Sequence, residues 1–219
     1  METLSEQLFE KLCTQYGVRF RCLCKTQSKT PDYLILLEKT RVIVEIKQFD
    51  MRGEDELIWE KVNEGQTVAY FPDTVKRIRK DIKRASKQIK LPNSKPCPKV
   101  IILYDNTGGI SDMSNENILN SMLGNEQILI IEDKLSNSLR LGNSKFGGGR
   151  TTTISEKNYL SAIGRLRNDL TLDIFHNPYA SCPLNRHHAK LFANHQFFIQ
   201  KPINSFYSMW HVWEPTDTL

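Results

Sequence analysis

The spacing of apolar residues predicts a helix followed by three strands in the first 48 residues. Apolar positions recur at helical spacing through residues 4–16, and Gly17 then ends the pattern. Residues 18–24 alternate between polar and apolar, and two further apolar runs follow at 33–38 and 41–47. We expect these last two runs to form a hairpin, because a short polar turn separates them.

The next part of the chain predicts a long helix and two more strands. Residues 50–72 are mixed and polar, which favours an irregular or partly helical segment. Residues 73–91 form a strongly periodic helix, and the apolar run at 99–105 is typical of a strand covered on both faces. A short helix at 115–124 and a strand at 126–133 complete this part. The order of these helices and strands indicates an α/β fold with a mixed sheet flanked by helices.

The pattern loosens after residue 135. Residues 139–154 suggest a hairpin with a glycine-rich tip, residues 157–169 a helix, and residues 170–180 a strand that runs into a turn. The sequence contains neither an internal repeat nor a linker long enough to require a domain boundary. We therefore expect one domain, with a core over residues 1–135 and a C-terminal extension over residues 136–219 packed on it.

Composition narrows the class of protein only slightly. The 219 residues are 39% hydrophobic and 25% charged, with a formal net charge of +5, which is ordinary for a globular protein with a mild preference for anionic partners. No apolar run is long enough to span a bilayer, and the N-terminus lacks the features of a signal peptide. The sequence thus predicts a cytoplasmic protein without a membrane partner, in which the five cysteines are reduced.

Three charged residues interrupt the apolar hairpin. If the turn is centred near Lys39, antiparallel pairing brings Asp32 opposite Glu45 and Lys47, which share one face of their strand. Two neighbouring carboxylates repel unless a cation lies between them, and Mg²⁺ prefers oxygen ligands. A lysine beside such an ion can hold a phosphate oxygen or orient a water molecule, as phosphodiester hydrolysis requires.

A simpler interpretation of Glu45 and Lys47 is an exposed ion pair on a solvated strand. That interpretation is the usual one for an isolated Glu-x-Lys. The aspartate at the mirrored position of the preceding strand favours a site instead, as do the aliphatic residues around the pair, because charges within an apolar strand are costly unless they have a partner or a function.

The residues Pro31-Asp32 and Glu45-Ile46-Lys47 resemble the signature of the PD-(D/E)XK nuclease superfamily. The order of elements over residues 1–135 is also similar to the αβββαβ core of its restriction-endonuclease-like fold. The resemblance implies that Asp32 and Glu45 bind Mg²⁺ or Mn²⁺, that Lys47 is catalytic, and that the substrate is DNA. Gln48 matches a variant of this motif in uncharacterised bacterial members, with a supporting role, and its side chain points away from the Lys47 face.

Many members of this superfamily add a carboxylate from the first helix. Glu6 and Glu10 are the candidates here. Glu6 lies nearer the apolar stripe and precedes Phe9 as in similar members, so we expect it to be the additional metal ligand and Glu10 to support it. The alternative for both is a surface glutamate near the start of a helix, where negative charge is favourable.

The helix at residues 73–91 is amphipathic and strongly basic. Its apolar positions are spaced alternately by three and four, and nearly all the others are cationic. Such a density of like charge suggests an anionic partner, although a solvated helix face is the simpler interpretation. The candidate nucleic-acid-binding residues are Arg77, Lys80, Arg84, Lys87 and Gln88.

The remaining motifs give weaker evidence of a functional site. The glycines of residues 146–150 lack the context of a phosphate-binding loop, and the cysteine and histidines of residues 182–195 match no common zinc site. Tyr104 and Asp105 end an apolar strand, where they either line the site or simply terminate the strand.

The sequence thus predicts a metal-dependent deoxyribonuclease, with two alternatives left open. One is a nucleic-acid-binding module that keeps the fold but has weak activity or none. The other is a partner-dependent subunit whose tail rich in histidine and aromatic residues contacts another protein. A homodimer is also left open. The pattern does not decide between DNA and RNA, nor the strandedness of the substrate.

Overall fold

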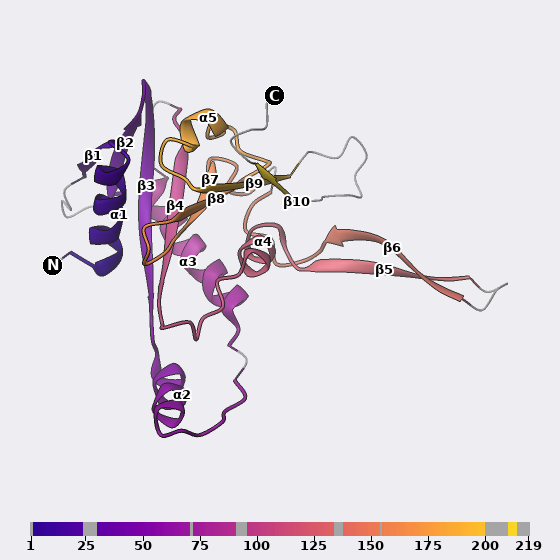
Figure 1. The fold of residues 1–219 in the computed structure, drawn as a ribbon. Coiled ribbons are helices and arrows are strands. Elements are labelled where there is room, and N and C mark those ends of the chain that lie inside the picture. Colours follow the sequence, from indigo (N-terminus) through magenta and orange to yellow (C-terminus); the bar gives the residue numbers. More distant parts are fainter. Residues whose placement is uncertain are drawn as a thin grey trace.

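The protein is a mixed α/β structure in which helices cover both faces of one large sheet (Figure 1). The sheet has eight strands in the order β1-β2-β3-β4-β7-β8-β9-β10. The computed structural model describes residues 2–23, 30–70, 72–90, 96–133, 138–153, 155–199 and 210–213.

The first helix and three strands form where the sequence predicts them. They are α1 (Leu4–Gln15), β1 (Arg19–Cys22), β2 (Tyr33–Leu37) and β3 (Thr40–Asp50). A capping box starts α1, because the Thr3 side chain accepts from the Glu6 amide while the Glu6 side chain accepts from the Thr3 amide. The strands β1, β2 and β3 are antiparallel neighbours, and Leu37 pairs with Thr40 across a two-residue turn.

Two helices and a parallel strand follow. They are α2 (Gly53–Asn63), α3 (Thr74–Ile89) and β4 (Lys99–Asn106), and β4 pairs with β3 in parallel. The Asp73 side chain caps α3 by accepting from the Lys76 amide. The apolar run of β4 is buried on both faces, as predicted, and none of the described helices is both long and apolar enough to cross a membrane.

A two-stranded ribbon projects from the body of the protein after α4 (Asn115–Leu123) (Figure 1). It consists of β5 (Glu126–Asp133) and β6 (Ser138–Phe146), which pair with each other in a two-stranded sheet of their own. The prediction of a hairpin with its glycine-rich tip at residues 147–149 was wrong. Residues 138–146 pair back onto β5 instead, and Gly147 and Gly148 bond to Asn125 at the base of the ribbon.

The C-terminal part extends the same sheet with β7 (Ala162–Leu166), β8 (Leu172–His176), β9 (His195–Ile199) and β10 (Trp210–Trp213), and α5 (Arg186–Ala189) lies between β8 and β9. The boundary expected at residue 135 lies outside the described residues. Residues 200–209 and 214–219 of the tail that we expected to contact a partner lie outside them too.

The prediction of a helix over residues 157–169 was wrong, because this segment contains the central strand β7. Both faces of β7 are covered and four of its five residues are buried, so the strand lacks the alternation of a half-exposed strand. Gly164 fits this crowded position, since an added Cβ would lie 3.1 Å from Ile102 Cγ1 and 3.2 Å from Leu172 Cδ1.

The sheet separates two apolar cores. One core lies under α1 and includes Val42, Val44 and Ile46 of β3. The other lies under α3 and α4 and includes Ile43 and Phe49 of the same strand. Because side chains alternate along a strand, residues 45 and 47 belong to the face that α3 covers.

The packing around Gly164 generates a prediction. Gly164→Val should lower the free energy of unfolding by about 1–3 kcal/mol, because the added methyl groups overpack the contact with Ile102 and Leu172. Gly53→Ala is the matched control, since no heavy atom lies within 4 Å of its added Cβ. Urea unfolding of both variants measures the effect, and a Gly164→Val protein as stable as the wild type would contradict this packing.

Candidate active site

The hairpin of β2 and β3 brings Asp32, Glu45 and Lys47 together on one face of the sheet. Tyr33 pairs with Val44, so Asp32 stands next to Glu45 across the two strands. The Ile46 amide donates to Asp32 Oδ2 over 2.8 Å, which fixes the Asp32 carboxylate at the entry of β2. Lys47 Nζ donates to Glu45 Oε1 over 2.5 Å. The predicted convergence of these three groups is therefore confirmed.

Burial makes this cluster electrostatically unusual. Glu45 has no exposed surface and Asp32 is 8% exposed, whereas the Lys47 side chain is 23% exposed. Burial, followed by the negative charge of Asp32, raises the pKa of the Glu45 carboxyl to about 7, although Lys47 partly offsets both. Near neutral pH the site therefore holds a carboxyl group that is only partly ionised.

One carboxylate oxygen of this cluster lacks a hydrogen-bond donor. Glu45 Oε2 is buried, and within the described part of the chain it has no hydrogen-bond partner. A buried oxygen without a donor is costly, and a cation beside Asp32 and Glu45 would satisfy it. Two carboxylates suit Mg²⁺, which keeps several water or phosphate oxygens among its ligands. The donor set therefore fits a small divalent cation.

The structure does not bring the glutamates of α1 to this pair. Glu6 Oε2 accepts from the Thr3 amide and hydroxyl at 2.7 and 2.9 Å, and Glu10 Oε1 accepts from the Tyr33 hydroxyl at 2.9 Å. Because α1 packs on the opposite face of the sheet from Glu45, the placement predicted for Glu6 is not found. Among the residues described, no three acidic, histidine or cysteine side chains gather at a possible metal site.

Gln48 belongs to the α1 face, as the alternation of β3 predicted. Its Oε1 accepts from the Ser5 amide over 3.0 Å, and its Nε2 donates to Asp50 Oδ1 over 2.6 Å. Gln48 thus ties the start of α1 to β3 and stabilises the strand from behind the site.

Arg77, one of the candidate nucleic-acid-binding residues, is held within the protein. Its guanidinium lies 4.9 Å from the centre of the Phe49 ring and donates to the Asp50 carbonyl, to Asp55 over 3.3 Å and to Ser111 over 3.1 Å. The side chain is only 11% exposed. Arg77 therefore joins α3 to the end of β3 and to α2.

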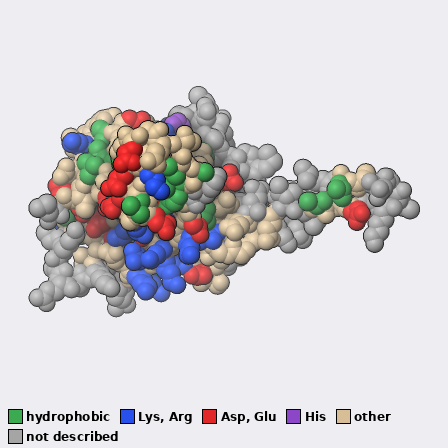
Figure 2. Space-filling model, turned by 90° about the horizontal axis from the view of Figure 1, so that it is seen from below, with side chains coloured by type: hydrophobic (Ala, Val, Ile, Leu, Met, Phe, Trp, Pro, Cys, Tyr) green, Lys and Arg blue, Asp and Glu red, His purple; other side chains and the backbone are tan. Residues whose placement is uncertain are grey.

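The other basic residues of α3 form a surface that we call the basic face of α3. Figure 2 shows Lys and Arg side chains gathered in a dense patch on one side of the molecule. The inner side of α3 packs into the core, and its Arg79 flank lies against α4, where Arg79 donates to the Asn120 carbonyl over 2.9 Å. Gln88 is partly exposed beside the basic face, whose exposed members are Lys76, Lys80, Lys83, Arg84, Lys87 and Lys90.

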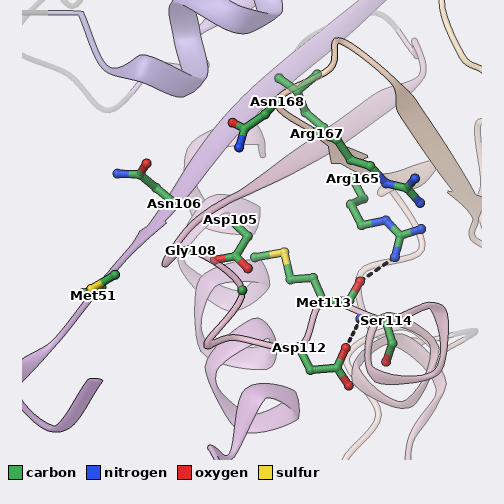
Figure 3. A pocket seen from close by; sticks show the side chains of 12 residues that line it. Met51, Asp105, Asn106, Gly108, Asp112, Met113, Ser114, Arg165, Arg167 and Asn168 are labelled. Carbon is green, nitrogen blue, oxygen red and sulfur yellow. Dashed lines mark hydrogen bonds between the residues drawn. The ribbon is translucent and has the colours of Figure 1, made fainter. Parts of the chain in front are cut away.

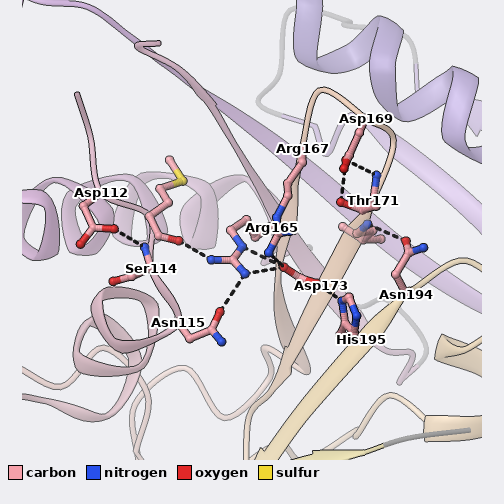
Figure 4. Close-up of polar contacts among 12 residues, drawn as sticks. Asp112, Ser114, Asn115, Arg165, Arg167, Asp169, Thr171, Asp173, Asn194 and His195 are labelled. Atoms are coloured by element: carbon pink, nitrogen blue, oxygen red, sulfur yellow. Dashed lines mark hydrogen bonds and ion pairs between the residues drawn. The ribbon is translucent and has the colours of Figure 1, made fainter. Parts of the chain in front are cut away.

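The sequence did not reveal a second polar cluster, which lies on β7 and β8, beyond β4 from Glu45 and Lys47. Arg165 lies in β7, and Arg167 lies in the loop after it. Both side chains donate hydrogen bonds to the buried Asp173 carboxylate of β8 (Figure 4).

Both arginines line a cleft of about 620 Å³, and so does Asp105 (Figure 3). Asp32, Glu45 and Lys47 are not among the lining residues of this cleft, so the expectation that Asp105 lines their site stays a prediction. The Arg-x-Arg spacing would have placed both arginines on one face of a strand, but the segment was predicted as a helix.

Known proteins give no further guide to the site. Comparison with protein-family models, with curated proteins and with solved structures finds no match to this chain.

The raised pKa of Glu45 generates a prediction about stability. Ionisation of Glu45 is less favourable in the folded than in the unfolded protein, so the wild type should lose stability as pH rises from about 4.5 through about 7. Relative to Glu45→Gln, the loss should approach about 3 kcal/mol in the absence of divalent cations, at 1.36 kcal/mol per pKa unit.

Urea unfolding of both proteins in EDTA, at several pH values between 4.5 and 8, measures this difference. Saturating Mg²⁺ should recover the stability of the wild type and leave Glu45→Gln nearly unchanged, since the cation favours the ionised carboxylate. Parallel pH profiles of the two proteins would contradict the assignment.

Proposed function

We propose that this protein is a metal-dependent nuclease that hydrolyses phosphodiester bonds of DNA on a restriction-endonuclease-like core. One observation carries the proposal. Among the described residues, a buried carboxylate oxygen of Glu45 has no donor, while Asp32 stands beside it and the Lys47 ammonium lies 2.5 Å from the other Glu45 oxygen. A pair of carboxylates with a neighbouring lysine has the components required for hydrolysis of a phosphodiester.

Asp32 and Glu45 would hold the divalent cation, Mg²⁺ or Mn²⁺. When bound, such an ion neutralises charge on the scissile phosphate and increases the acidity of a water molecule. Asp32 is already oriented for this role, because the Ile46 amide fixes its Oδ2. Glu45 gains a partner for its buried oxygen, which offsets the cost of ionising it.

Lys47 would act on the substrate. One of its three donors points to Glu45, and its partly exposed side chain leaves the others for a phosphate oxygen or for the attacking water. In the reaction, water adds to phosphorus and the bond from phosphorus to the sugar oxygen breaks. The proton that the water loses is matched by one that the leaving oxygen gains. Lys47 stabilises the negative charge that develops on the phosphate.

The basic face of α3 supports nucleic acid as the substrate. This helix covers the same face of the sheet as Glu45 and Lys47, and its exposed side is almost entirely cationic. Contacts of this kind neutralise backbone phosphates without reading bases. We therefore expect a long polyanion rather than a small phosphate ester, with limited sequence preference.

A nucleic-acid-binding module without hydrolytic activity is the second candidate. It is favoured by the absence, among the described residues, of a third acidic, histidine or cysteine side chain beside Asp32 and Glu45. A weakly held cation would give low activity while the basic face of α3 still bound DNA.

Cleavage assays with active-site variants test the proposal. Asp32→Asn should abolish cutting that depends on Mg²⁺ or Mn²⁺, and Lys47→Ala should lower it at least about 100-fold, because each removes a group that stabilises the transition state. Lys39→Ala is the matched control, since Lys39 is an exposed lysine in the turn of the same hairpin. Plasmid, single-stranded DNA and RNA serve as substrates, with EDTA as the blank.

If the wild type binds DNA and never cuts it with either metal, the module without activity is favoured. Equal cutting by the wild type and both variants would refute the catalytic assignment.

The salt dependence of DNA binding tests the basic face of α3. Replacing Lys80 and Lys87 together with Gln should weaken binding and reduce the slope of log K against log salt by about 2, at roughly 0.9 per lost phosphate contact. Lys11→Gln is the control, because Lys11 is an exposed helical lysine of α1, on the opposite face. An unchanged slope in the double variant would show that these lysines are merely solvated.

A further inference from the structure

Asp173 organises a cluster of basic side chains at the edge of the sheet where β7 ends and β8 begins (Figure 4). It has no exposed surface. Its Oδ2 accepts from Arg165 Nε over 2.9 Å and from Arg167 over 2.8 Å, and its Oδ1 lies 2.8 Å from His195 Nδ1. A single buried carboxylate thus fixes two guanidinium groups and an imidazole.

The described contacts of Arg165 all hold parts of the protein together. Besides Asp173, its guanidinium donates to the Met113 carbonyl over 2.5 Å and to Asn115 Oδ1 over 2.7 Å. It also lies 5.7 Å from the centre of the Phe175 ring. Arg165 therefore ties β7 to the segment that leads into α4 and forms a rigid wall of the cleft.

Arg167 is available to a ligand. Its side chain is 45% exposed, and only one of its nitrogens takes part in the contacts described. Arg167 shares the Asp173 carboxylate with Arg165, and the exposed Asp169 on the following loop also interacts with the charge of Arg167. A guanidinium held in place on one side by a carboxylate keeps its other donors in a fixed direction, which suits a phosphate group.

The cleft beside Arg167 is large enough for a nucleotide. Its volume is about 620 Å³, within the range of small-molecule sites, and it lies at the carboxyl ends of β4 and β7 (Figure 3). Gly108 and Gly109 line the facing wall with φ values of 68° and 93°. The described hydrogen bonds of this loop run through Thr107 and leave both glycine amides unused.

The cleft is not lined by positive charge alone. Asp105 and Asp112 also line it. Asp105 accepts from Thr107, and Asp112 accepts from the Ser114 amide and from Asn117. These carboxylates disfavour a bare anion but can accept hydrogen bonds from hydroxyl or amino groups. A ligand that combines a phosphate with such donors fits the lining better than inorganic phosphate does.

We propose that this cleft binds a nucleotide unit, with its phosphate on Arg167 and its sugar or base near the carboxylates. The nucleotide is either free or part of a nucleic-acid strand, and the same chemistry serves both. Lys47 and Arg165 each pair with Leu103, so they occupy one row across the sheet. Two strand spacings, about 10 Å, separate their backbones. The strand-bound form rests on the proposed function, whereas the free form does not.

Calorimetric titration in EDTA, where metal-dependent hydrolysis is absent, tests the proposal with deoxyadenosine monophosphate, deoxyadenosine and inorganic phosphate. The wild type should bind the monophosphate more tightly than either fragment. Arg167→Gln should weaken that binding at least about tenfold, and Arg167→Lys should weaken it less, because lysine keeps the charge but loses the fork. Arg19→Gln, at an exposed arginine of β1, should have no effect.

A labelled single-stranded oligonucleotide distinguishes the two sources. If Arg167→Gln weakens binding of the oligonucleotide alone, the site accepts a nucleotide within a strand. If the variant changes neither titration, or if inorganic phosphate binds as tightly as the monophosphate, the proposal is overturned. Thermal unfolding confirms that each variant is folded.

The test of nucleotide binding can succeed or fail independently of the nuclease proposal. Asp32→Asn should retain full binding of the monophosphate while it loses cleavage. A wild type that never cuts DNA, but binds the nucleotide through Arg167, would refute the catalytic assignment and leave this site standing.

Discussion

The pairing of β2 with β3 is the constraint on which the proposed chemistry depends. Val42, Val44 and Ile46 pack under α1, so the residues between them must face α3. A slip of one residue would turn three aliphatic side chains out of their core and bury Lys47 in it. The apolar core therefore fixes the polar site, and the Ile46 amide completes it by holding Asp32 in register.

This arrangement carries a cost, which the proposed cation would offset. A fully buried Glu45 beside Asp32 ionises reluctantly, and Lys47 offsets only part of the penalty. A protein selected for stability alone would favour an aliphatic residue at position 45, as at its neighbours in β3. Local conflict of this kind, within an otherwise consistent strand, is typical of functional sites. The unsatisfied oxygen of Glu45 is the structural sign of that conflict.

The sequence predicted the parts of the molecule that local pattern determines. Apolar spacing over fewer than twenty residues predicted the hairpin and, separately, the basic helix α3. The charged residues of the hairpin were visible as interruptions of that spacing. The placement of Glu6 did not follow, because it depends on which face of the sheet α1 covers. Strand β7 was mistaken for a helix because a strand buried on both faces loses its alternation. The cluster around Asp173 arises from register between strands, which no local window contains.

Helix α3 links these features because it serves two purposes at once. Its inner face closes the core over β3 and β4, so its position is set by packing. Its outer face then presents cationic side chains at a fixed place relative to Glu45 and Lys47. Arg77 anchors its first turn to the end of β3, and Arg79 anchors it to α4. Under the proposed function, a charged surface held this firmly would align the nucleic acid with the groups on the sheet below better than a flexible basic tail would.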